Sequence, residues 1–543
     1  MLVKKNIDSI IPILKKDSRR ALGMKVPGFP RPYFCSFLLR DIHWFNTWAS
    51  SGSTYRRRSD HTRSVYCDIR VGSYKYDQVT EGGLMDNDDE QESYSHVRVP
   101  IDDRVYTGLR IGLWRLSESK FREALSDYSS RKASGLSTID SNKKLPSFTR
   151  VRPTVSVKYA RPERVDEEKW VRFCKNASKW MSELPKASGN WVEFDASQAT
   201  RILVNTERTV IVQHSLIFSL TATFRSLTGD GSHIEQDLIF NCASQKELPD
   251  MKTFKRLALR KYERLLDLMH SRKIHSFSGP VLLYPKPAGL LFHEAIGHRL
   301  EGSRLLSSGE GQTFKGQIGK RVIGVDVSIR DDPTLKKFRG QRCIGAYEYD
   351  DEGVPAQDTL LVEDGFLREF LTTRSAINSR GFASNGHARN AKFQRPISRM
   401  AVTIVEGRET YSMDELKELL IKEIQEQKKP FGMIVYQTSG GETETTSFDF
   451  QAFNGDISYA TLVYPDGREV DVRGVDFVGT PLQAMNNVIA VGDEQVLENG
   501  YCGAESGFIP ISTISPAILL RNLELQAKDE ELVTQYILAR PNI

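Results

Sequence analysis

Two histidines and a glutamate stand close together in His293-Glu294-Ala295-Ile296-Gly297-His298. Imidazole nitrogens are common zinc ligands, and a neighbouring carboxylate can act as a general base, so these residue types suit a hydrolytic metal site. The spacing is H-E-x-x-x-H, one residue longer than the H-E-x-x-H motif of many zinc peptidases. On a regular α-helix, residues five apart point about 140° away from each other, so the two rings would not share one metal ion.

The spacing therefore predicts that the helix widens locally into a π-type turn, a rare distortion that tends to occur at functional sites. Gly297 directly precedes the second histidine, and glycine permits such a distortion. The alternative interpretation is a surface helix with two unrelated histidines. The flanking sequence favours the metal site, because a short apolar strand, Pro280–Tyr284, and a turn, Pro285–Gly289, come before the motif. That order places the histidines on a rigid element at the end of a sheet.

A catalytic zinc ion usually has about three protein ligands and one position left for water. His293 and His298 would supply two ligands, and Glu294 would take a proton from the metal-bound water as it attacks a carbonyl carbon. The residue pattern leaves the third ligand open, with these candidates: Glu301, His387, Cys502 and an aspartate such as Asp326.

The composition is that of an ordinary globular protein large enough for two or more domains, with 543 residues, 39% hydrophobic and 27% charged. A net charge of +5 is small for this length, so we expect no nucleic-acid partner. We also expect no membrane segment and no secretory signal, because no apolar run approaches the ~20 residues of a membrane helix. The six cysteines are scattered without a C-x-x-C pair, which indicates a cytoplasmic protein.

The order of predicted elements indicates an α+β protein with two domains, an N-terminal α/β domain over residues 1–279 and a β-rich domain over residues 280–543 that carries the metal site. In the first part, apolar periodicity predicts helices over residues 166–184 and 254–269 and a strand over residues 216–224. In the second part we expect two hairpins, over residues 360–367 and 460–472, and a helix that begins with a Ser412–Glu415 capping box. Ser439–Gly441 is expected to form a turn.

The segment Phe292–Gly302 resembles the signature of the TldD/PmbA family of metallopeptidases. Further blocks along the second half of the chain also resemble that family, and the likeness covers about residues 280–525. These blocks are Tyr349–Pro355 with Leu361–Gly365, Gly381–Gly386 with Pro396 and Arg399-Met400, and Tyr501–Gly503 with Pro510 and Asn522-Leu523.

The resemblance implies an N-terminal α/β domain and a β-rich C-terminal domain that holds Zn²⁺. It also implies that the zinc ligands are His293, His298 and Cys502 and that Glu294 is the catalytic base. Family members form dimers that enclose a cleft, so we expect a homodimer or a heterodimer with a related subunit. A sister class of subunits lacks the H-E-x-x-x-H motif, which this chain has.

The substrates of the family are unfolded or modified peptides held by main-chain pairing as an added strand. The glycine-rich segment Ser439–Gly441 is a hypothesis for the strand that would receive such a peptide. We therefore interpret the sequence as that of a zinc-dependent metallopeptidase. The alternatives are a non-catalytic peptide-binding subunit with a structural metal and a metal hydrolase that acts on a non-peptide amide.

Overall fold

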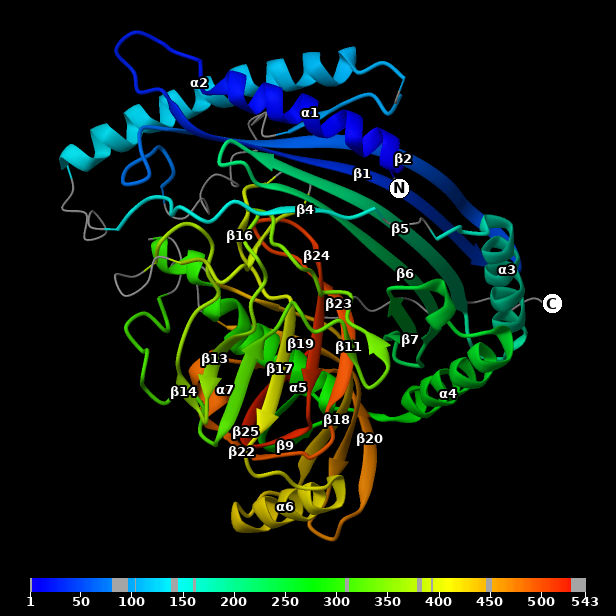
Figure 1. Cartoon of the computed structure of the whole chain (residues 1–543). Helices are drawn as coiled ribbons and strands as arrows, with labels where there is room; N and C mark the ends of the chain where they lie inside the picture. Colours follow the sequence, from blue (N-terminus) through cyan, green and yellow to red (C-terminus); the bar gives the residue numbers. More distant parts are fainter. Residues whose placement is uncertain are drawn as a thin grey trace.

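The computed structural model describes residues 2–80, 96–102, 104–137, 145–159, 163–307, 312–377, 383–391, 394–445 and 452–528. Within these ranges the chain is a mixed α+β protein, as the sequence predicted (Figure 1). One large sheet occupies the N-terminal half, and two main sheets occupy the C-terminal half. Residues 381 and 382 of the family-like block Gly381–Gly386 lie outside the described ranges.

The N-terminal sheet is built around four long strands in the order β2-β1-β5-β6, all antiparallel to their neighbours. Three shorter strands extend it: β3 pairs with β2, while β7 and β4 pair with β6. The strands are β1 (Pro32–Ser50), β2 (Ser53–Val71), β3 (His96–Arg98), β4 (Val155–Val157), β5 (Gly189–Asn205), β6 (Val210–Leu227) and β7 (His233–Cys242).

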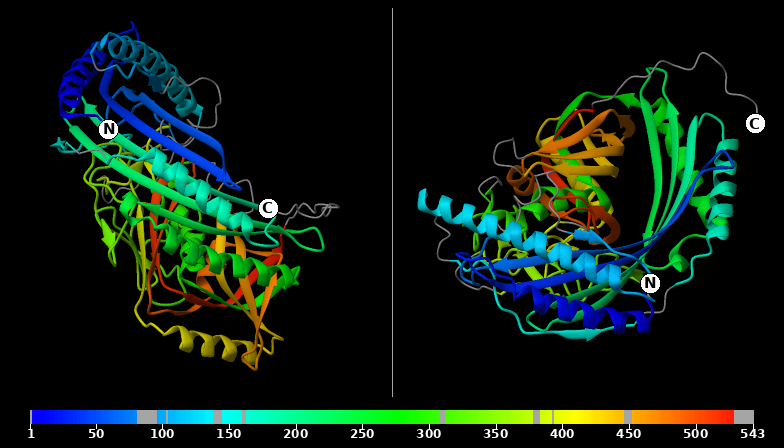
Figure 2. Two further views of the ribbon diagram at one scale, coloured as in Figure 1. Left: turned by 90° about the vertical axis from the view of Figure 1, so that its right-hand side faces the viewer. Right: turned by 90° about the horizontal axis from the view of Figure 1, so that it is seen from above.

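Four helices lie along the outer side of this curved sheet (Figure 2). They are α1 (Lys4–Ala21), α2 (Thr107–Ser137), α3 (Glu167–Glu183) and α4 (Met251–His270). The amphipathic helices α3 and α4 confirm the sequence prediction, and each begins at an aspartate whose side chain accepts a backbone N–H, Asp166 and Asp250 respectively. Their apolar faces pack on β1, β5 and β6 and form one of the apolar cores of this half.

The eight-stranded C-terminal sheet closes on itself, because β18 pairs with β9 on one side and with β19 on the other. The ring runs β18-β9-β25-β21-β19, and β20, β8 and β22 attach to it. The strands are β8 (Arg272–Lys273), β9 (Ser276–Leu283), β18 (Gly432–Thr443), β19 (Phe453–Val463), β20 (Glu469–Arg473), β21 (Val475–Gly479), β22 (Val488–Val491) and β25 (Ile518–Ala527).

The six-stranded sheet has the order β14-β13-β10-β17-β24-β23, and β14 and β23 are its edge strands. Its strands are β10 (Val327–Asp331), β13 (Thr359–Glu363), β14 (Phe366–Leu367), β17 (Val402–Gly407), β23 (Val496–Cys502) and β24 (Ile509–Ser515). Two short ribbons complete the described strands: β11 (Lys337–Phe338) with β12 (Gln341–Arg342), and β15 (Ala388–Arg389) with β16 (Ile397–Ser398).

Both predicted hairpins are present, as β13–β14 and as β19–β20. The turn of the first has positive φ at both central residues, Asp364 and Gly365, which matches the twist of a tight hairpin. Helix α6 (Met413–Glu426) begins with the predicted capping box, in which Ser412 and Glu415 bond to each other's backbone N–H. The short helix α7 (Pro481–Asn486) follows β21.

Two local predictions were wrong. Pro285–Gly289 is not a turn but the first part of helix α5 (Pro285–Phe292), because proline lacks only an N–H that the first helical turn leaves unpaired anyway. Ser439–Gly441 is not a turn either; it lies inside β18, where Gly440 and Gly441 pair with β19 across an irregular register. Glycine is tolerated in such an irregular strand.

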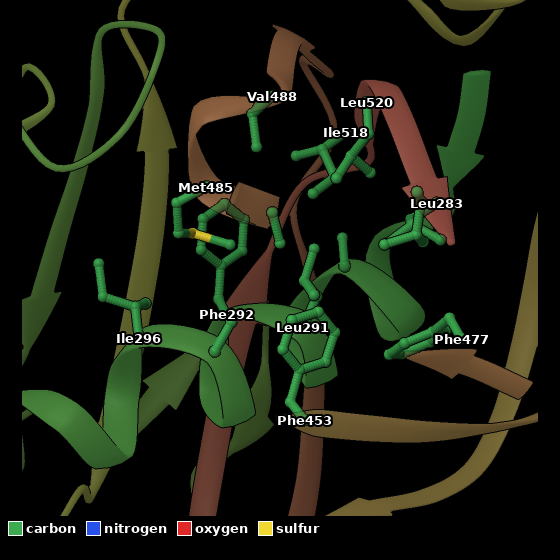
Figure 3. Packing of buried hydrophobic residues seen from close by; sticks show 14 of the residues in the cluster. Leu283, Leu291, Phe292, Ile296, Phe453, Phe477, Met485, Val488, Ile518 and Leu520 are labelled. Atoms are coloured by element: carbon green, nitrogen blue, oxygen red, sulfur yellow. The ribbon is translucent and has the colours of Figure 1, made fainter. Parts of the chain in front are cut away.

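Helix α5 is anchored in the largest apolar core formed by the described residues (Figure 3). Leu291 lies among side chains of the closed sheet, and Phe292 lies beside Met485 of α7. Burial of a leucine or phenylalanine side chain is worth about 1.5–3 kcal/mol, so these contacts hold the end of α5, and the motif that follows it, in a defined position.

The break between the sheets falls between β7 and β8, and β9 runs across residues 279 and 280 as a single strand of the C-terminal sheet. The division of the chain into domains at residue 279 stays a prediction. Within the described ranges, none of the helices combines the length and the apolar composition that a membrane crossing requires.

Candidate metal centre

The H-E-x-x-x-H motif continues α5 as a π-helical segment, His293–Gly297, followed by a 3-10 turn, His298–Leu300. The backbone N–H of His298 donates to the carbonyl oxygen of His293, five residues earlier. This widened turn brings the two rings onto one side of the helix, with their centroids 4.9 Å apart. The structure therefore confirms the widening that the spacing predicted.

Gly297 is needed here for space and not for its backbone freedom. Its φ and ψ, −56° and −54°, are ordinary right-handed helical values that any residue adopts. A Cβ atom at this position would lie 2.2 Å from the sulfur of Met400, well inside contact distance. The helix widens around Gly297 as predicted, and the feature of the structure that requires glycine there is the close approach of Met400.

Cys502, at the end of edge strand β23, lies directly against the two imidazoles. Its sulfur is 3.2 Å from His293 Nε2 and 3.4 Å from His298 Nε2. One ligand atom from each of the three residues lies within 4.8 Å of the others, and all three side chains are buried. Tertiary structure thus brings together two side chains of one helix and a third that follows about two hundred residues later.

The electrostatics of this cluster suit a cation. Burial opposes ionisation of the Cys502 thiol, but His298 and His293 outweigh burial and hold the pKa of the thiol well below its usual range. Burial likewise lowers the pKa of His298, but Cys502 and Glu301 raise it to about 10. The pKa of His293 is raised as well, against the effect of burial, chiefly by Cys502. Cysteine binds a metal ion as the thiolate, and histidine binds it as the neutral imidazole. A cation bound here would therefore displace the imidazolium protons.

The donor set fits zinc. Two imidazole nitrogens and one thiolate are typical zinc ligands, and a tetrahedral ion with zinc–nitrogen and zinc–sulfur distances of about 2.0 and 2.3 Å would separate a nitrogen from the sulfur by about 3.5 Å. The sulfur–nitrogen separations of 3.2 and 3.4 Å are close to that span. Three protein donors leave the fourth position of a tetrahedral ion for water or substrate.

Glu294 lies beside the cluster, with Oε2 3.9 Å from His298 Nε2. Its backbone is fixed by Arg299, whose Nη1 donates to the Glu294 carbonyl oxygen and to Thr443 of β18. The Glu294 side chain is buried, at 7% exposure, next to the ligand atoms. This position is within reach of a water molecule held between the carboxylate and the three donors.

Glu301, one of the candidates for the third ligand, instead contacts Nδ1 of His298, the ring nitrogen that faces away from Cys502. Its Oε2 lies 3.1 Å from His298 Nδ1 and 3.0 Å from Arg304 Nη2. Burial would raise the pKa of Glu301, but His298, Arg304 and Arg399 bring it down to about 2, so the carboxylate is ionised. A carboxylate on the far nitrogen of a ligating histidine fixes the ring and raises its basicity.

Sequence reasoning missed the two arginines that complete this arrangement. Arg304 pairs with Glu505, through Nη1 at 2.8 Å, as well as with Glu301. Arg399 Nη2 donates to the sulfur of Cys502 at 3.1 Å, and its side chain is fully buried. Arg399 belongs to a block that resembles the family, which was the available signal, but its contact with Cys502 depends on the fold.

The remaining candidates lie elsewhere. Asp326 is half-exposed and pairs with Arg321 Nη2 at 2.7 Å. His387 is fully buried, and its Nε2 lies 3.3 Å from Asp331 Oδ1. Asp331 in turn accepts backbone N–H groups at the start of β17, so this pair connects loops and strands of the six-stranded sheet.

The segment that carries this site is similar to known proteins. Residues 276–527 match the PmbA/TldA metallopeptidase C-terminal domain. A protein of Methanothermobacter thermautotrophicus described as "Metalloprotease" is 30% identical over 277 residues, which are 51% of this chain and 56% of that protein. A "Zinc metalloprotease TldD homolog" of Saccharolobus solfataricus is 25% identical over 252 residues, 45% of this chain and 51% of that protein. The chain thus spans about half the length of the curated relatives it matches.

The fold as a whole is similar to the crystal structure of TldE from Thermococcus kodakarensis, with a TM-score of 0.60. That alignment covers 96% of this chain and 100% of the other chain at 12% identity, so the likeness concerns the fold. The matched C-terminal domain contains the H-E-x-x-x-H segment and Cys502, and the fold extends the likeness over the N-terminal half. Residues 276–527 of this chain thus belong to the TldD/PmbA family.

Proposed function

We propose that this protein is a zinc-dependent metallopeptidase that hydrolyses peptide bonds in unfolded or modified peptides. The observation that carries the proposal is the buried group of His293, His298 and Cys502 with Glu294 beside it. Relatives described as metalloproteases, one of them as a zinc metalloprotease, support the same activity.

Zinc held by His293, His298 and Cys502 would lower the pKa of a water molecule and polarise the substrate carbonyl. Glu294 takes the proton from the water as the water attacks the carbonyl carbon, and then delivers it to the leaving amine. Glu301 keeps the His298 ring oriented throughout, through its contact with Nδ1. The cluster is almost closed to solvent, which strengthens the electrostatic interactions on which each of these steps depends.

We propose that the peptide binds as an added strand along the second half of β18. Strand β9 pairs with Met433, Ile434 and Val435, and among the described strands only β19 pairs with the part of β18 from Gln437 to Thr443. Thr443 contacts Arg299, which in turn holds the Glu294 backbone. A peptide paired there would be held by main-chain hydrogen bonds, independent of its sequence.

We further propose that the active particle is a dimer, either of two copies or with a related subunit, and that it works in the cytoplasm. The family resemblance supports the first part, and six free cysteines fit a reducing compartment.

The test combines metal analysis with mass spectrometry of the products from an unfolded peptide, with and without a chelator. The proposal expects zinc in the purified protein, peptide fragments, and loss of cleavage on chelation that zinc restores. Peptide binding without fragments would instead establish a binding subunit with a structural metal. Cleavage of a small non-peptide amide with no peptide fragments would establish the other alternative.

A further inference from the structure

A second group of metal-ligand side chains lies on the N-terminal sheet, away from the motif. It consists of Asp41 and His43 on β1 and His61 on β2. His61 Nε2 lies 3.0 Å from Asp41 Oδ2, and His43 Nε2 lies 3.4 Å from Asp41 Oδ1. The two imidazole rings are stacked, with centroids 3.7 Å apart and planes 19° apart. One ligand atom from each residue lies within 4.8 Å of the other two.

Strand geometry explains why the three side chains meet. Asp41 and His43 are two residues apart on one strand, so their side chains project from the same face. His61 is the direct partner of His43 in the antiparallel register, and directly opposed side chains have Cβ atoms about 4.5–5.5 Å apart. Both positions belong to long, continuously paired strands, so the donors are placed by rigid backbone and not by a loop.

The surroundings leave the group accessible from one side. On the same face of β1, Phe37 and Leu39 pack beneath α1 and α2, whereas Phe45 packs against α3. Asp41 and His43 stand between these two covered regions. Asp41 is fully buried, but the side chains of His43 and His61 are 42% and 26% exposed. A cation and its water ligands can therefore reach the ring nitrogens from solvent.

One oxygen of the Asp41 carboxylate is available to bind a metal ion. Arg63, opposite Asp41 on β2, donates through Nε to Oδ2 at 2.8 Å. Oδ1 is buried and makes no hydrogen bond of acceptable geometry with the described residues, and it faces His43. Burial would raise the pKa of Asp41, but its histidine and arginine neighbours bring it down to about 2, so the carboxylate is charged at neutral pH. An unsatisfied, charged oxygen in a buried position is costly unless a cation or donor compensates it.

We propose that Asp41, His43 and His61 form a second metal site, which binds a divalent transition ion of the zinc type and ties β1 to β2. Two imidazole nitrogens and one carboxylate oxygen are ordinary zinc ligands, and water from the exposed side completes the coordination. The guanidinium of Arg63 opposes a second positive charge nearby, so this site binds zinc more weakly than the centre that contains Cys502. The site is independent of peptide cleavage, and its role is to stiffen the long β1–β2 hairpin.

The test uses the full chain with Zn²⁺ as the probe. Wild-type protein is expected to bind two zinc ions per chain, as measured by metal analysis after equilibrium dialysis, and His61→Gln is expected to bind one. His233→Gln is the matched control, because His233 is an exposed histidine of the same sheet that lies outside the group. It is expected to bind two ions.

Cobalt distinguishes the two sites. A Cys502 thiolate ligand gives a sulfur-to-cobalt charge-transfer absorption, which an Asp41–His43–His61 site does not produce. His61→Gln is expected to lose one cobalt ion and keep that absorption, whereas Cys502→Ser is expected to lose the absorption and keep one ion. In the Cys502→Ser background, His43→Gln or His61→Gln is expected to raise the Kd of the remaining ion at least about tenfold.

The proposal is overturned if His43→Gln and His61→Gln bind as many ions, and as tightly, as wild type. It is also overturned if Cys502→Ser protein, folded by circular dichroism, binds no zinc. Failure of peptide cleavage in any of these proteins bears on the proposed function and not on this site, because the readout here is ion stoichiometry.

Discussion

Arg399 donates through Nη2 to the sulfur of Cys502 at 3.1 Å, and the same nitrogen donates to the Cys502 carbonyl oxygen at 3.0 Å. Its Nε lies 3.4 Å from Glu301 Oε1. One buried guanidinium therefore joins the proposed sulfur ligand to the carboxylate that holds His298. The proposed ligands and their supports form a connected set, so a change to one member is expected to affect metal binding at the others.

Glu294→Gln is expected to keep zinc and to lose peptide cleavage by about 10²–10⁴-fold, because the amide cannot accept the proton of the attacking water. Parallel metal analysis and product mass spectrometry measure the two effects separately. Glu418→Gln, on the exposed side of α6, is the control and should cleave normally. Cleavage retained in the Glu294 variant would exclude this residue as the base.

Cys502→Ser is expected to lower the affinity of the motif site for zinc by more than about a hundredfold, because it replaces a proposed metal ligand with a weaker donor. Competition with a chromophoric chelator measures the change. Cys242→Ser, at a partly buried cysteine of β7, controls for the loss of a thiol. Equal zinc affinity in wild type and the Cys502 variant would show that the sulfur is not a ligand.

Glu301→Gln is expected to weaken zinc binding by about 10–100-fold, because the neutral amide no longer fixes and polarises the His298 ring through Nδ1. Glu301→Asp keeps the charge but shortens the side chain, so partial recovery is expected. The same chelator competition gives both values. An unchanged affinity in the glutamine variant would limit Glu301 to a packing role.

Gly297→Ala is expected to lower the free energy of unfolding by about 1–3 kcal/mol, because the new methyl group overlaps the sulfur of Met400. Urea denaturation measures the change. In a Met400→Ala background the same substitution should cost less, since the overlapping atoms are gone. An equal cost in both backgrounds would contradict the steric explanation.

Asp68 is expected to contribute to the loss of stability in acid. Its carboxylate pairs with Arg70 at 2.9 Å and with Arg395 at 2.9 Å, so it links the N-terminal sheet to the C-terminal half. Burial would raise the pKa of Asp68, but the two arginines lower it from 3.8 to about 2. A lowered folded-state pKa means that the stabilisation is complete above pH 3.8 and disappears as the pH falls through about 2.

The difference between the unfolded-state and folded-state pKa of Asp68 corresponds to about 2 kcal/mol of unfolding free energy at neutral pH. Asp68→Asn is therefore expected to be less stable than wild type at pH 7, with a smaller further loss between about pH 4 and pH 2. Urea denaturation across this range compares the two proteins, and Asp493→Asn, at an exposed aspartate, serves as the control. If the free energy of unfolding fell with pH equally in wild type and the Asp68 variant, Asp68 would not contribute to the loss of stability in acid.

Local features were predictable from the chain because neighbouring residues decide them. The capping box at Ser412 and Glu415, the hairpin turn at Asp364 and the widened turn at the histidine motif depend on interactions within a few residues. The error at Pro285 has a local cause as well, since proline suits both a turn and the first turn of a helix.

The residues alone determined the α+β class and the need for a distorted helix between the histidines, and they also led to the proposal of His293 and His298 as a donor pair with Glu294 as the base. Residue spacing did not choose Cys502 from the other candidates; the family resemblance did, and the fold then placed its sulfur 3.2 Å from His293. Tertiary structure also decided the contact of Arg399 with that sulfur and the packing of Met400 on Gly297. The physical reason is that these contacts join segments a hundred or more residues apart, and the order of strands in the sheets, not local sequence, sets which distant residues meet.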